Sequence, residues 1–561
     1  MDSTSLFIEF FSNNKLTFIV NLILILFNYP LEIIVLSFLS SKIFVKFTDL
    51  KGNWDQIVWL VLLTLGSYVA LELSISLKDY LDSSYIPKFE EFVRHKIIDQ
   101  VFKKNEINCD NVRLGALIQR LMKIPQSLSD VYERFNKYII PFFLTVLTVV
   151  IYLFYINISL GVIGLSSFII YFLIYSYVAK IQIGYSKQRE KDETDLYDDI
   201  DDTLGNIFTI FSHNQLPHEK QRMTDQSNRF NVVFEKELYE SARLKMIVSF
   251  MNISIFAVFI YTILYLFKKG EISQPITIGL FTMSMFLVKH IRGLARRVTE
   301  GLVSVGNLKE GDDYLTALKD DGILNGVTRN FIKKGEINFK NVWFNYPGSK
   351  HSSLHNVNFK ISPSENVVII GKSGSGKSTI MKLLMGFYQP QRGGVEIDGV
   401  DLRNADRSYL RGHLKYLNQN VRLFNRSIID NIVYGTGVDN KTAKQVIGSL
   451  NISKVLSSKD LDQPAGKFGD HLSGGQKQMV QLIRCYLYKS KLALLDEPTS
   501  AIDPTHKKDV VKMIQHLMKT RQVIMVTHDW SLVNIFQRLI YVEGGKILYD
   551  GPPSAFPLKS E

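Results

Sequence analysis

The chain has 561 residues, 46% of them hydrophobic and 12% aromatic, which excludes a disordered protein and implies at least two domains. It has only two cysteines, Cys109 and Cys485, whose wide separation excludes a scaffold held by disulfides. The formal net charge of +12 would suit nucleic-acid binding. Because nearly all long apolar runs precede residue 290, basic cytosolic loops facing anionic lipid explain this charge better.

The N-terminal half is predicted to form a membrane domain with six spans at residues 15–305, after an interfacial segment at residues 1–14. A spanning helix needs about 20 mostly apolar residues. Short apolar runs are also found in buried core helices, but the stretch 138–183 is too long for one helix and predicts two that turn near residues 157–161. The six expected spans are residues 15–44 (interrupted by Pro30), 56–77, two within 138–183, 246–267 and 275–290.

Two long loops set the predicted orientation of the spans. Residues 78–137 and 184–245 are rich in Lys and Arg, so positive-inside reasoning places them in the cytosol, together with the N-terminus and the C-terminal domain. Both loops keep apolar residues at helical spacing, and we expect them to be extensions of the membrane helices rather than a separate loop domain. In the first loop these residues are Phe89, Phe92, Ile97 and Val101.

Two acidic residues fall within the predicted spans. Glu32 and Glu72 would be costly to place in a bilayer, and ionisable groups there are often functional. Either residue lines a cavity for a transported solute, or it lies at an interface where water solvates it. The sequence leaves both interpretations open.

A linker is predicted at residues 306–333, and a soluble α/β domain follows at residues 334–561. Residues 335–344 alternate partly and predict a strand, and a short buried strand is expected at residues 366–370. The second strand leads directly into a glycine-rich loop and a helix, which is the setting of a nucleotide-binding phosphate loop. The loop consists of Gly371, Lys372, Ser373, Gly374, Ser375, Gly376, Lys377, Ser378 and Thr379.

This loop predicts that the domain binds a nucleotide together with Mg²⁺. Its glycines allow backbone N–H groups to surround phosphate oxygens at the N-terminus of the following helix. We expect Lys377 to contact the β- and γ-phosphates and Ser378 to bind Mg²⁺.

Two further strands end in polar residues. Residues 492–495 lead into Asp496 and Glu497, which suits a Mg²⁺ ligand followed by a base that polarises water. Residues 523–527 lead into His528, a candidate sensor of the γ-phosphate. Without further context, Asp496 and Glu497 would be interpreted as acidic residues exposed to solvent, and His528 as a residue with a structural role. The phosphate loop about 120 residues earlier favours the catalytic interpretation.

The segment Leu472-Ser473-Gly474-Gly475-Gln476 lies just before a predicted helix and about 20 residues before Asp496. It resembles the signature of ATP-binding cassette (ABC) ATPases. Nearly the whole chain resembles a half-size ABC exporter, the type shared by multidrug, peptide, lipid and mitochondrial-type transporters. The resemblance implies a fold class: an α-helical six-span membrane domain followed by an α/β P-loop ATP-binding cassette domain.

The resemblance also implies roles for matching residues. Tyr346 would stack on adenine, and Gln419 would contact Mg²⁺ and the attacking water. Ser473 and Gly475, with Gln476 of the same motif, would contact ATP bound by the opposite cassette. The loop from Ser500 to Asp503 would cross to that cassette, and segments 108–116 and 205–211 resemble coupling helices. These roles require a dimer: a second copy of the chain is expected, and a heterodimer is also permitted.

Three positions depart from the family pattern. Lys467 stands where exporters often have an acid, in a segment thought to contact coupling helices, so the charge pattern of coupling is in doubt. Met479 replaces a common Arg, and Pro498 a common Ala. None of these changes removes a phosphate ligand or the base.

The expected function is ATP-driven export of an amphipathic solute, peptide or lipid by an integral, multi-pass membrane ATPase. Lipid flipping is a close alternative within this class. A different class, a non-transporting ABC channel or regulatory subunit, often has a degenerate cassette, which this sequence lacks. The substrate and the membrane are not identified by the sequence, and the membrane half argues against a nucleic-acid ATPase.

Overall fold

The computed structural model describes residues 2–30, 35–47, 53–107, 114–318, 326–349, 351–450, 456 and 460–557. The chain divides into two compact units. One comprises Met1–Asn105 and Asn111–Asp320, and the other comprises Glu106–Asp110 and Asp321–Glu561.

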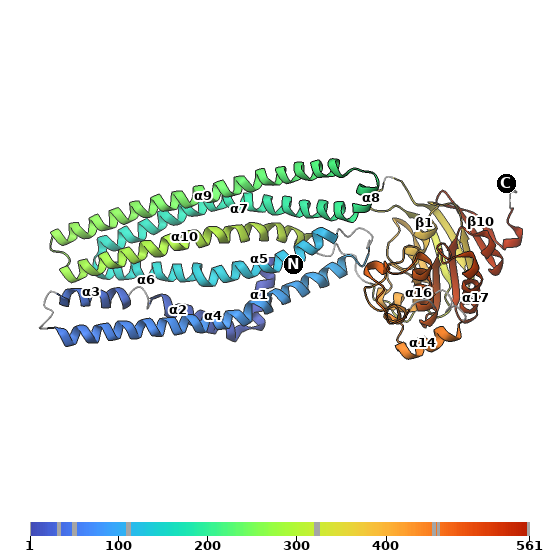
Figure 1. The fold of residues 1–561 in the computed structure, drawn as a ribbon, viewed down its shortest axis with the longest axis horizontal. Helices are drawn as coiled ribbons and strands as arrows, with labels where there is room; N and C mark the ends of the chain where they lie inside the picture. Colours follow the sequence, from blue (N-terminus) through green and yellow to red (C-terminus); the bar gives the residue numbers. More distant parts are fainter. Residues whose placement is uncertain are drawn as a thin grey trace. The chain divides into compact units, whose positions relative to one another are not determined.

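The first unit is helical, and α7, α9 and α10 pack against one another (Figure 1). Its long helices extend well beyond the thickness of a bilayer, which confirms that the charged loops continue the apolar helices. Its elements are α1 (Ser3–Asn13), α2 (Lys15–Pro30), α3 (Leu36–Lys46), α4 (Trp54–Lys104), α5 (Leu114–Arg134), the π-helix η4 (Phe135–Ile139), α6 (Ile140–Ile156), α7 (Ile158–Gly205), α8 (Ile207–Ser212), α9 (Leu216–Lys268) and α10 (Gln274–Ala317).

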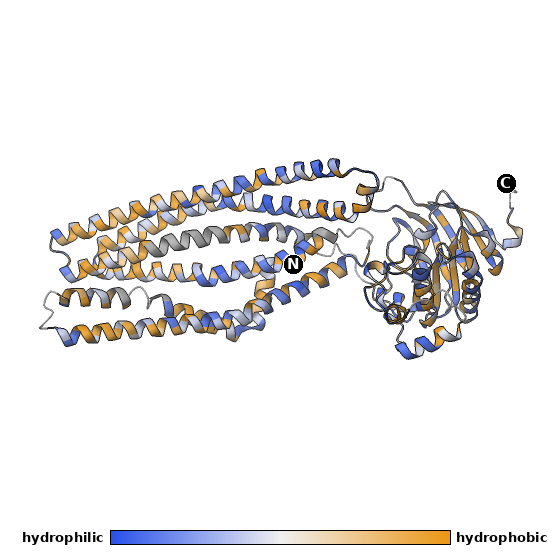
Figure 2. Cartoon of the chain, in the orientation of Figure 1, coloured by the Kyte–Doolittle hydropathy of each residue, from blue (hydrophilic) through white to orange (hydrophobic). Residues whose placement is uncertain are grey.

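Among the described residues, four helices are long and apolar enough to cross a membrane: α4, Leu117–Ile156, α7 and α9. A fifth span is obtained if α1 and Lys15–Leu26, which meet at 97°, are counted together. In α10, the apolar part Gln274–Val288 is shorter. Figure 2 shows that the apolar residues of α7 and α9 gather toward the ends distant from α8. A helical membrane region is therefore confirmed, and the number of six spans stays a prediction.

The turn expected near residue 157 is confirmed. Helix α6 ends at Ile156, and Asn157 adopts an extended backbone. The Asn157 side chain accepts a hydrogen bond of 2.8 Å from the backbone N–H of Ser159 and so caps α7. The cap satisfies one of the free N–H groups at the start of that helix.

The predicted apolar face of the first long loop is also confirmed. Phe89, Ile97 and Val101 of α4 are buried in one cluster with Leu6 and Phe10 of α1. The N-terminal helix therefore packs on protein through its apolar side. Its position at a membrane surface stays a prediction.

The second unit contains two sheets. A four-stranded sheet has the order β2-β1-β4-β5, and its paired strands are antiparallel. A six-stranded sheet has the order β10-β9-β3-β8-β7-β6, in which only the β9–β10 pair is antiparallel. The strands are β1 (Ile337–Phe344), β2 (Leu354–Ile361), β3 (Val367–Ile370), β4 (Arg392–Ile397), β5 (Val400–Asp401), β6 (Leu414–Leu417), β7 (Leu492–Asp496), β8 (Gln522–Thr527), β9 (Arg538–Glu543) and β10 (Lys546–Gly551).

The helices of this unit are short. They are α11 (Lys377–Leu384), α12 (Arg407–His413), α13 (Ile428–Val433), α14 (Asn440–Ser449), α16 (Gly474–Leu487) and α17 (Pro504–Thr520), with 3₁₀ turns at Lys467–Gly469, Trp530–Ile535 and Pro553–Ala555.

The central strands are buried on both faces, which explains their continuous apolar sequences. In β3, Val368 and Ile370 belong to one hydrophobic cluster, whereas Val367 and Ile369 belong to the other. Neighbouring residues of a strand point to opposite faces, so each strand is held by two cores.

Candidate active site

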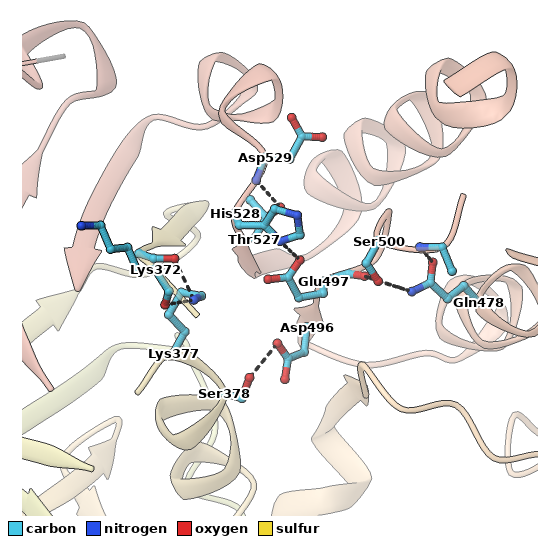
Figure 3. A network of polar contacts seen from close by, with 12 residues as sticks. Lys372, Lys377, Ser378, Gln478, Asp496, Glu497, Ser500, Thr527, His528 and Asp529 are labelled. Carbon is cyan, nitrogen blue, oxygen red and sulfur yellow. Dashed lines mark hydrogen bonds and ion pairs between the residues drawn. The ribbon is translucent and has the colours of Figure 1, made fainter. Parts of the chain in front are cut away.

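The residues that the sequence singled out after three strands lie together. Strands β3, β8 and β7 are neighbours and run parallel, so their carboxyl ends meet at one edge of the sheet. Figure 3 shows Lys377 and Ser378 after β3, Asp496 and Glu497 at the end of β7, and His528 after β8. Ligands of open parallel sheets bind at this edge.

The lysine of the glycine-rich loop is held inside its own loop. Its Nζ donates hydrogen bonds of 2.8 Å to the backbone carbonyls of Gly371 and Lys372 (Figure 3). Burial lowers the pKa of Lys377, and the nearby Glu497 and Asp496 oppose this shift. The ammonium group is therefore fixed at the point where a phosphate would enter the loop.

Gly374 and Gly376 of the loop differ in why the structure favours a glycine at each position. Gly376 has φ of +102°, and a Cβ atom there would lie 2.7 Å from the carbonyl oxygen of Ser353. Gly374 also has a positive φ, +78°, but a Cβ there would meet nothing within 4 Å. Only Gly376 therefore combines a left-handed backbone with close packing.

Asp496 is a buried oxygen site next to Ser378. Ser378 Oγ donates to Asp496 Oδ1 at 3.1 Å, and the Tyr416 hydroxyl donates to Oδ2 at 2.8 Å. Burial raises the pKa of Asp496, while both hydrogen bonds act in the opposite direction. Tyr416 lies on β6 and has no recognisable motif, so it could be found only from the pairing of β6 with β7.

The side-chain oxygens of Ser378 and Asp496 fit a Mg²⁺ site. Within the described part of the chain, no cluster of three or more His, Cys, Asp or Glu side chains could hold a metal by itself. Mg²⁺ typically takes one or two protein oxygens and completes its shell with phosphates and water. Ser378 and Asp496 suit this pattern, and Gln419 is exposed in the loop after β6.

Glu497 and His528 form a pair between adjacent strands. His528 Nδ1 lies 2.7 Å from Glu497 Oε2, and the Glu497 side chain is almost entirely buried whereas His528 is exposed. The backbone of Glu497 has φ of +53°, and its N–H donates to Val526 of β8 at 2.9 Å. A non-glycine residue in this region is uncommon and is found at functional sites.

Gln478, which the sequence analysis missed, joins this pair to the next loop. Its amide nitrogen donates to the Glu497 carbonyl at 3.2 Å and to Ser500 Oγ at 2.7 Å. Its amide oxygen accepts from the N–H of Ala501 at 3.0 Å. Gln478 is buried on α16, two residues after the signature, and this proximity is the only sequence signal that pointed to it.

The signature segment starts α16. Ser473 caps the helix, and Ser473 and Gln476 exchange hydrogen bonds in a capping box. A Cβ atom on Gly475 would lie 2.7 Å from the carbonyl oxygen of Ala501, so a glycine is needed for this approach. Asp503 caps α17 by accepting from the N–H of Thr505 at 2.8 Å.

Tyr346 lies beside the phosphate loop. Its hydroxyl is 3.1 Å from Thr379 Oγ1, and its ring packs edge-on against Phe344 and Tyr388. The Lys382 ammonium lies 5.5 Å from the centre of the ring. Half-buried packing of this kind fixes the ring and leaves part of it accessible.

The other predicted positions are less informative. Glu72 is exposed on α4, and Glu32 lies outside the described residues. The first expected coupling segment falls mostly on residues 108–113, which are also outside them, and α8 forms the second with no buried residue.

Two departures from the family pattern have structural settings. Met479 is fully buried in a core cluster, which explains an apolar residue at this position. Lys467 begins a 3₁₀ turn, and its Nζ lies 5.5 Å from the centre of the Phe468 ring.

Two family models match the chain. One, described as "ABC transporter transmembrane region", matches residues 16–291, and the other, described as "ABC transporter", matches residues 354–500. Together they cover most of both units.

Relatives and solved structures agree with these models. An ATP-dependent lipid A-core flippase of Thiobacillus denitrificans is 25% identical over 510 residues, which is 89% of this chain and 86% of that protein. A protein of the same name from Methylobacillus flagellatus is 31% identical over 290 residues, and the match spans 51% of this chain and about half (48%) of that relative. The structure of a bacterial Atm1-family ABC exporter with ATP bound has a TM-score of 0.83 at 18% identity, with 96% of this chain and 95% of that chain covered. This last likeness shows the fold.

Proposed function

Because the chain belongs to the ABC transporter family and is a half-size exporter, we propose that it hydrolyses MgATP between two copies of itself to move a lipid-like amphiphile. The chain is an integral multi-pass membrane protein with a cytosolic ABC domain, and its ATPase activity is coupled to transport. The proposal concerns the site residues, the metal, the second copy and the substrate.

The Glu497–His528 pair carries the catalytic part of the proposal. Glu497 has a buried carboxylate whose backbone is fixed between two strands. Such a group can orient a water molecule and accept its proton. His528 holds one carboxylate oxygen at 2.7 Å and is exposed enough to contact a phosphate as well.

The phosphate loop would stabilise the charge of the reacting phosphate. Lys377 is already held at the loop, and its carbonyl partners would be exchanged for phosphate oxygens when ATP binds. Ser378 and Asp496 would hold Mg²⁺, with Gln419 as a further ligand, and the metal would neutralise negative charge on the phosphates. Tyr346 would stack on the adenine ring.

A second copy would complete each ATP site. The chain has one membrane region and one cassette, which is half of the usual transporter. We assign to Ser473, Gly475 and Gln476 contacts with ATP on the opposite cassette, and to the loop from Ser500 to Asp503 contacts with that cassette itself. A heterodimer with a related chain is the alternative. The domain limits proposed for this architecture are 15–305 and 334–561, with a linker at 306–333 whose first residues, up to Ala317, continue helix α10.

The lipid-like substrate is proposed from the relatives. The relatives from Thiobacillus denitrificans and Methylobacillus flagellatus are both named ATP-dependent lipid A-core flippases, and the first aligns over most of both chains. A peptide or another amphipathic solute remains the second candidate.

The test is ATP-dependent lipid movement in proteoliposomes. A fluorescent phospholipid is placed in both leaflets, and the fraction that a membrane-impermeant quencher reaches is followed after ATP is added. We expect ATP to change this fraction for the wild type and not for Glu497→Gln. An unchanged fraction for a wild type that hydrolyses ATP would refute the lipid substrate while leaving the ATPase assignment intact.

A further inference from the structure

The carboxylate of Asp496 is held from two sides. Ser378 Oγ of α11 donates to Asp496 Oδ1 at 3.1 Å (Figure 3), and the hydroxyl of Tyr416 on β6 donates to the other oxygen, Oδ2, at 2.8 Å. Asp496 is only 1% exposed, and Tyr416 is half-buried. Each carboxylate oxygen therefore has its own partner, one at the end of the phosphate loop and one on a neighbouring strand.

The pairing of β6 with β7 explains why a tyrosine reaches this carboxylate. In the parallel pair, Tyr416 lies opposite Leu494, two residues before Asp496. Residues two apart on a strand point to the same face of the sheet and are separated by about 6.6 Å. Tyr416 packs on the hydrophobic cluster that contains Leu494, as expected for a shared face. A long side chain is needed to cover this distance, and a serine or threonine at position 416 would be too short.

The ring of Tyr416 is itself held by its neighbours. It packs edge-on against Phe387, with the ring centres 6.2 Å apart and the ring planes at 62°. The guanidinium group of Arg411 lies 5.1 Å from the centre of the Phe387 ring. Aromatic packing of this kind fixes the orientation of a ring. The hydroxyl of Tyr416 therefore meets Asp496 from one defined direction.

We propose that Tyr416 is a positioning residue for the metal-binding carboxylate. The terminal side-chain bond of an aspartate is broad in its preferences and could present either oxygen. The hydrogen bond from Tyr416 occupies Oδ2, so Oδ1 stays on the side of Ser378, the other proposed Mg²⁺ ligand. This inference rests on the proposed role of Asp496 in holding Mg²⁺. It assigns a role to a residue that belongs to none of the motifs described above.

The size of the effect follows from other metal sites. Carboxylates that bind metals are typically fixed by hydrogen bonds of their own, and loss of such a bond lowers metal affinity or activity by about 10- to 100-fold. Tyr416→Phe removes only the hydroxyl and keeps the ring that packs on Phe387. We therefore expect this variant to remain folded and to bind the metal about tenfold more weakly.

The test measures metal binding apart from turnover. The full chain in lipid nanodiscs is mixed with an equal concentration of a non-hydrolysable ATP analogue, and binding of Mn²⁺ in place of Mg²⁺ is followed by electron paramagnetic resonance. A solution of the analogue alone gives the baseline. In Tyr416→Phe, Mn²⁺ affinity should fall about tenfold, while affinity for the analogue in EDTA should stay within about twofold of the wild type. A general structural defect would lower both.

Tyr549→Phe is the matched control. Tyr549 lies on β10, at the opposite edge of the same sheet, and its hydroxyl donates to the Pro552 carbonyl at 2.7 Å. The control loses the same kind of hydrogen bond far from Asp496 in the order of strands, and it should keep the Mn²⁺ affinity of the wild type. An equal loss of affinity in Tyr549→Phe and Tyr416→Phe would overturn the positioning role.

Asp496→Asn separates this inference from the proposed metal site. Its Mn²⁺ affinity should fall at least as far as that of Tyr416→Phe. If Asp496→Asn loses affinity and Tyr416→Phe stays within about twofold of the wild type, the role of Tyr416 is refuted and the metal site stands. If Asp496→Asn keeps the affinity of the wild type, the metal site itself is refuted, and the role of Tyr416 with it.

Discussion

His528 Nδ1 lies 2.7 Å from Glu497 Oε2, so the residues that follow two adjacent parallel strands are in direct contact. One oxygen of the Glu497 carboxylate, Oε2, is held by His528. The pair therefore links the orientation of the base to a residue that can also sense phosphate.

Replacing His528 by alanine should lower ATP turnover by about 10²-fold, because the base loses its orienting partner and the phosphate loses a donor. Nucleotide binding should change much less. His516→Ala is the control, since His516 is exposed on α17 and packs only near Tyr486. Turnover within about threefold of the wild type would show that His528 is structural.

Replacing Asp496 by asparagine should abolish Mg²⁺-dependent ATP hydrolysis without lowering the melting temperature. Burial raises the pKa of Asp496, so the neutral form favours the fold. The stability that the neutral form provides is present below the ordinary pKa and is lost as the pH rises through the raised value. Asparagine is neutral at every pH, so it avoids the cost of burying the charged form of this side chain. Thermal unfolding at pH 7.5 and ATPase assays with and without Mg²⁺ measure both effects. A clear fall in melting temperature would contradict the burial argument.

Removing the Gln478 bridge should lower both activity and stability. Gln478→Leu leaves the Ala501 N–H without its partner and removes the hydrogen bond that the Ser500 hydroxyl accepts, although this hydroxyl still donates to the Glu497 carbonyl. The loss should cost about 1–3 kcal/mol of unfolding free energy. The altered loop should also reduce ATP turnover. Gln515→Leu, at an exposed position of α17, serves as the control and should change neither quantity. Wild-type stability in Gln478→Leu would mean that the bridge contributes nothing.

Two glycine substitutions separate backbone strain from steric overlap. Gly374→Ala should cost about 1 kcal/mol, because only the positive φ is unfavourable for alanine. Gly376→Ala should cost clearly more and should prevent ATP binding, since its Cβ would lie 2.7 Å from a backbone oxygen. Thermal unfolding and binding of a fluorescent ATP analogue measure the difference. Equal effects of the two substitutions would contradict a close contact between position 376 and the Ser353 carbonyl.

Cys485 should make stability depend on pH in a defined range. Burial raises the pKa of its thiol from 9.0 to about 11. The stabilisation by the neutral thiol is therefore complete below pH 9 and is lost as the pH rises toward 11. The difference in melting temperature between the wild type and Cys485→Ala should shrink over this range. A difference that stays constant from pH 8 to pH 11 would mean that the thiol is accessible to water.

The sequence predicted the elements whose signals are local. The strands before the phosphate loop, Glu497 and His528 were placed within one or two residues, because short apolar runs and glycine-rich loops mark their own boundaries. The turn at Asn157 was found because no single helix could span the preceding apolar stretch. Of the four-stranded sheet, only β1 was predicted, since its pairing partners are distant in sequence.

The sequence identified most residues of the site but not the contacts between them. No local pattern shows that Tyr416 donates to Asp496, because this contact depends on the pairing of β6 with β7. The bridge made by Gln478 depends similarly on the packing of α16 against the loop after β7. The roles of the predicted residues stay predictions until the substitutions above are measured.

The most direct test of the proposed mechanism is the ATPase activity of the chain purified alone in lipid nanodiscs, beside Glu497→Gln. Glu396→Gln, on β4 of the same unit, is the matched control. We expect the wild type and the control to hydrolyse ATP, and Glu497→Gln to bind ATP but turn over at least about 10²-fold more slowly. Near-normal turnover in Glu497→Gln would contradict the assignment of the base. Absence of activity in the well-folded wild type would contradict a functional homodimer.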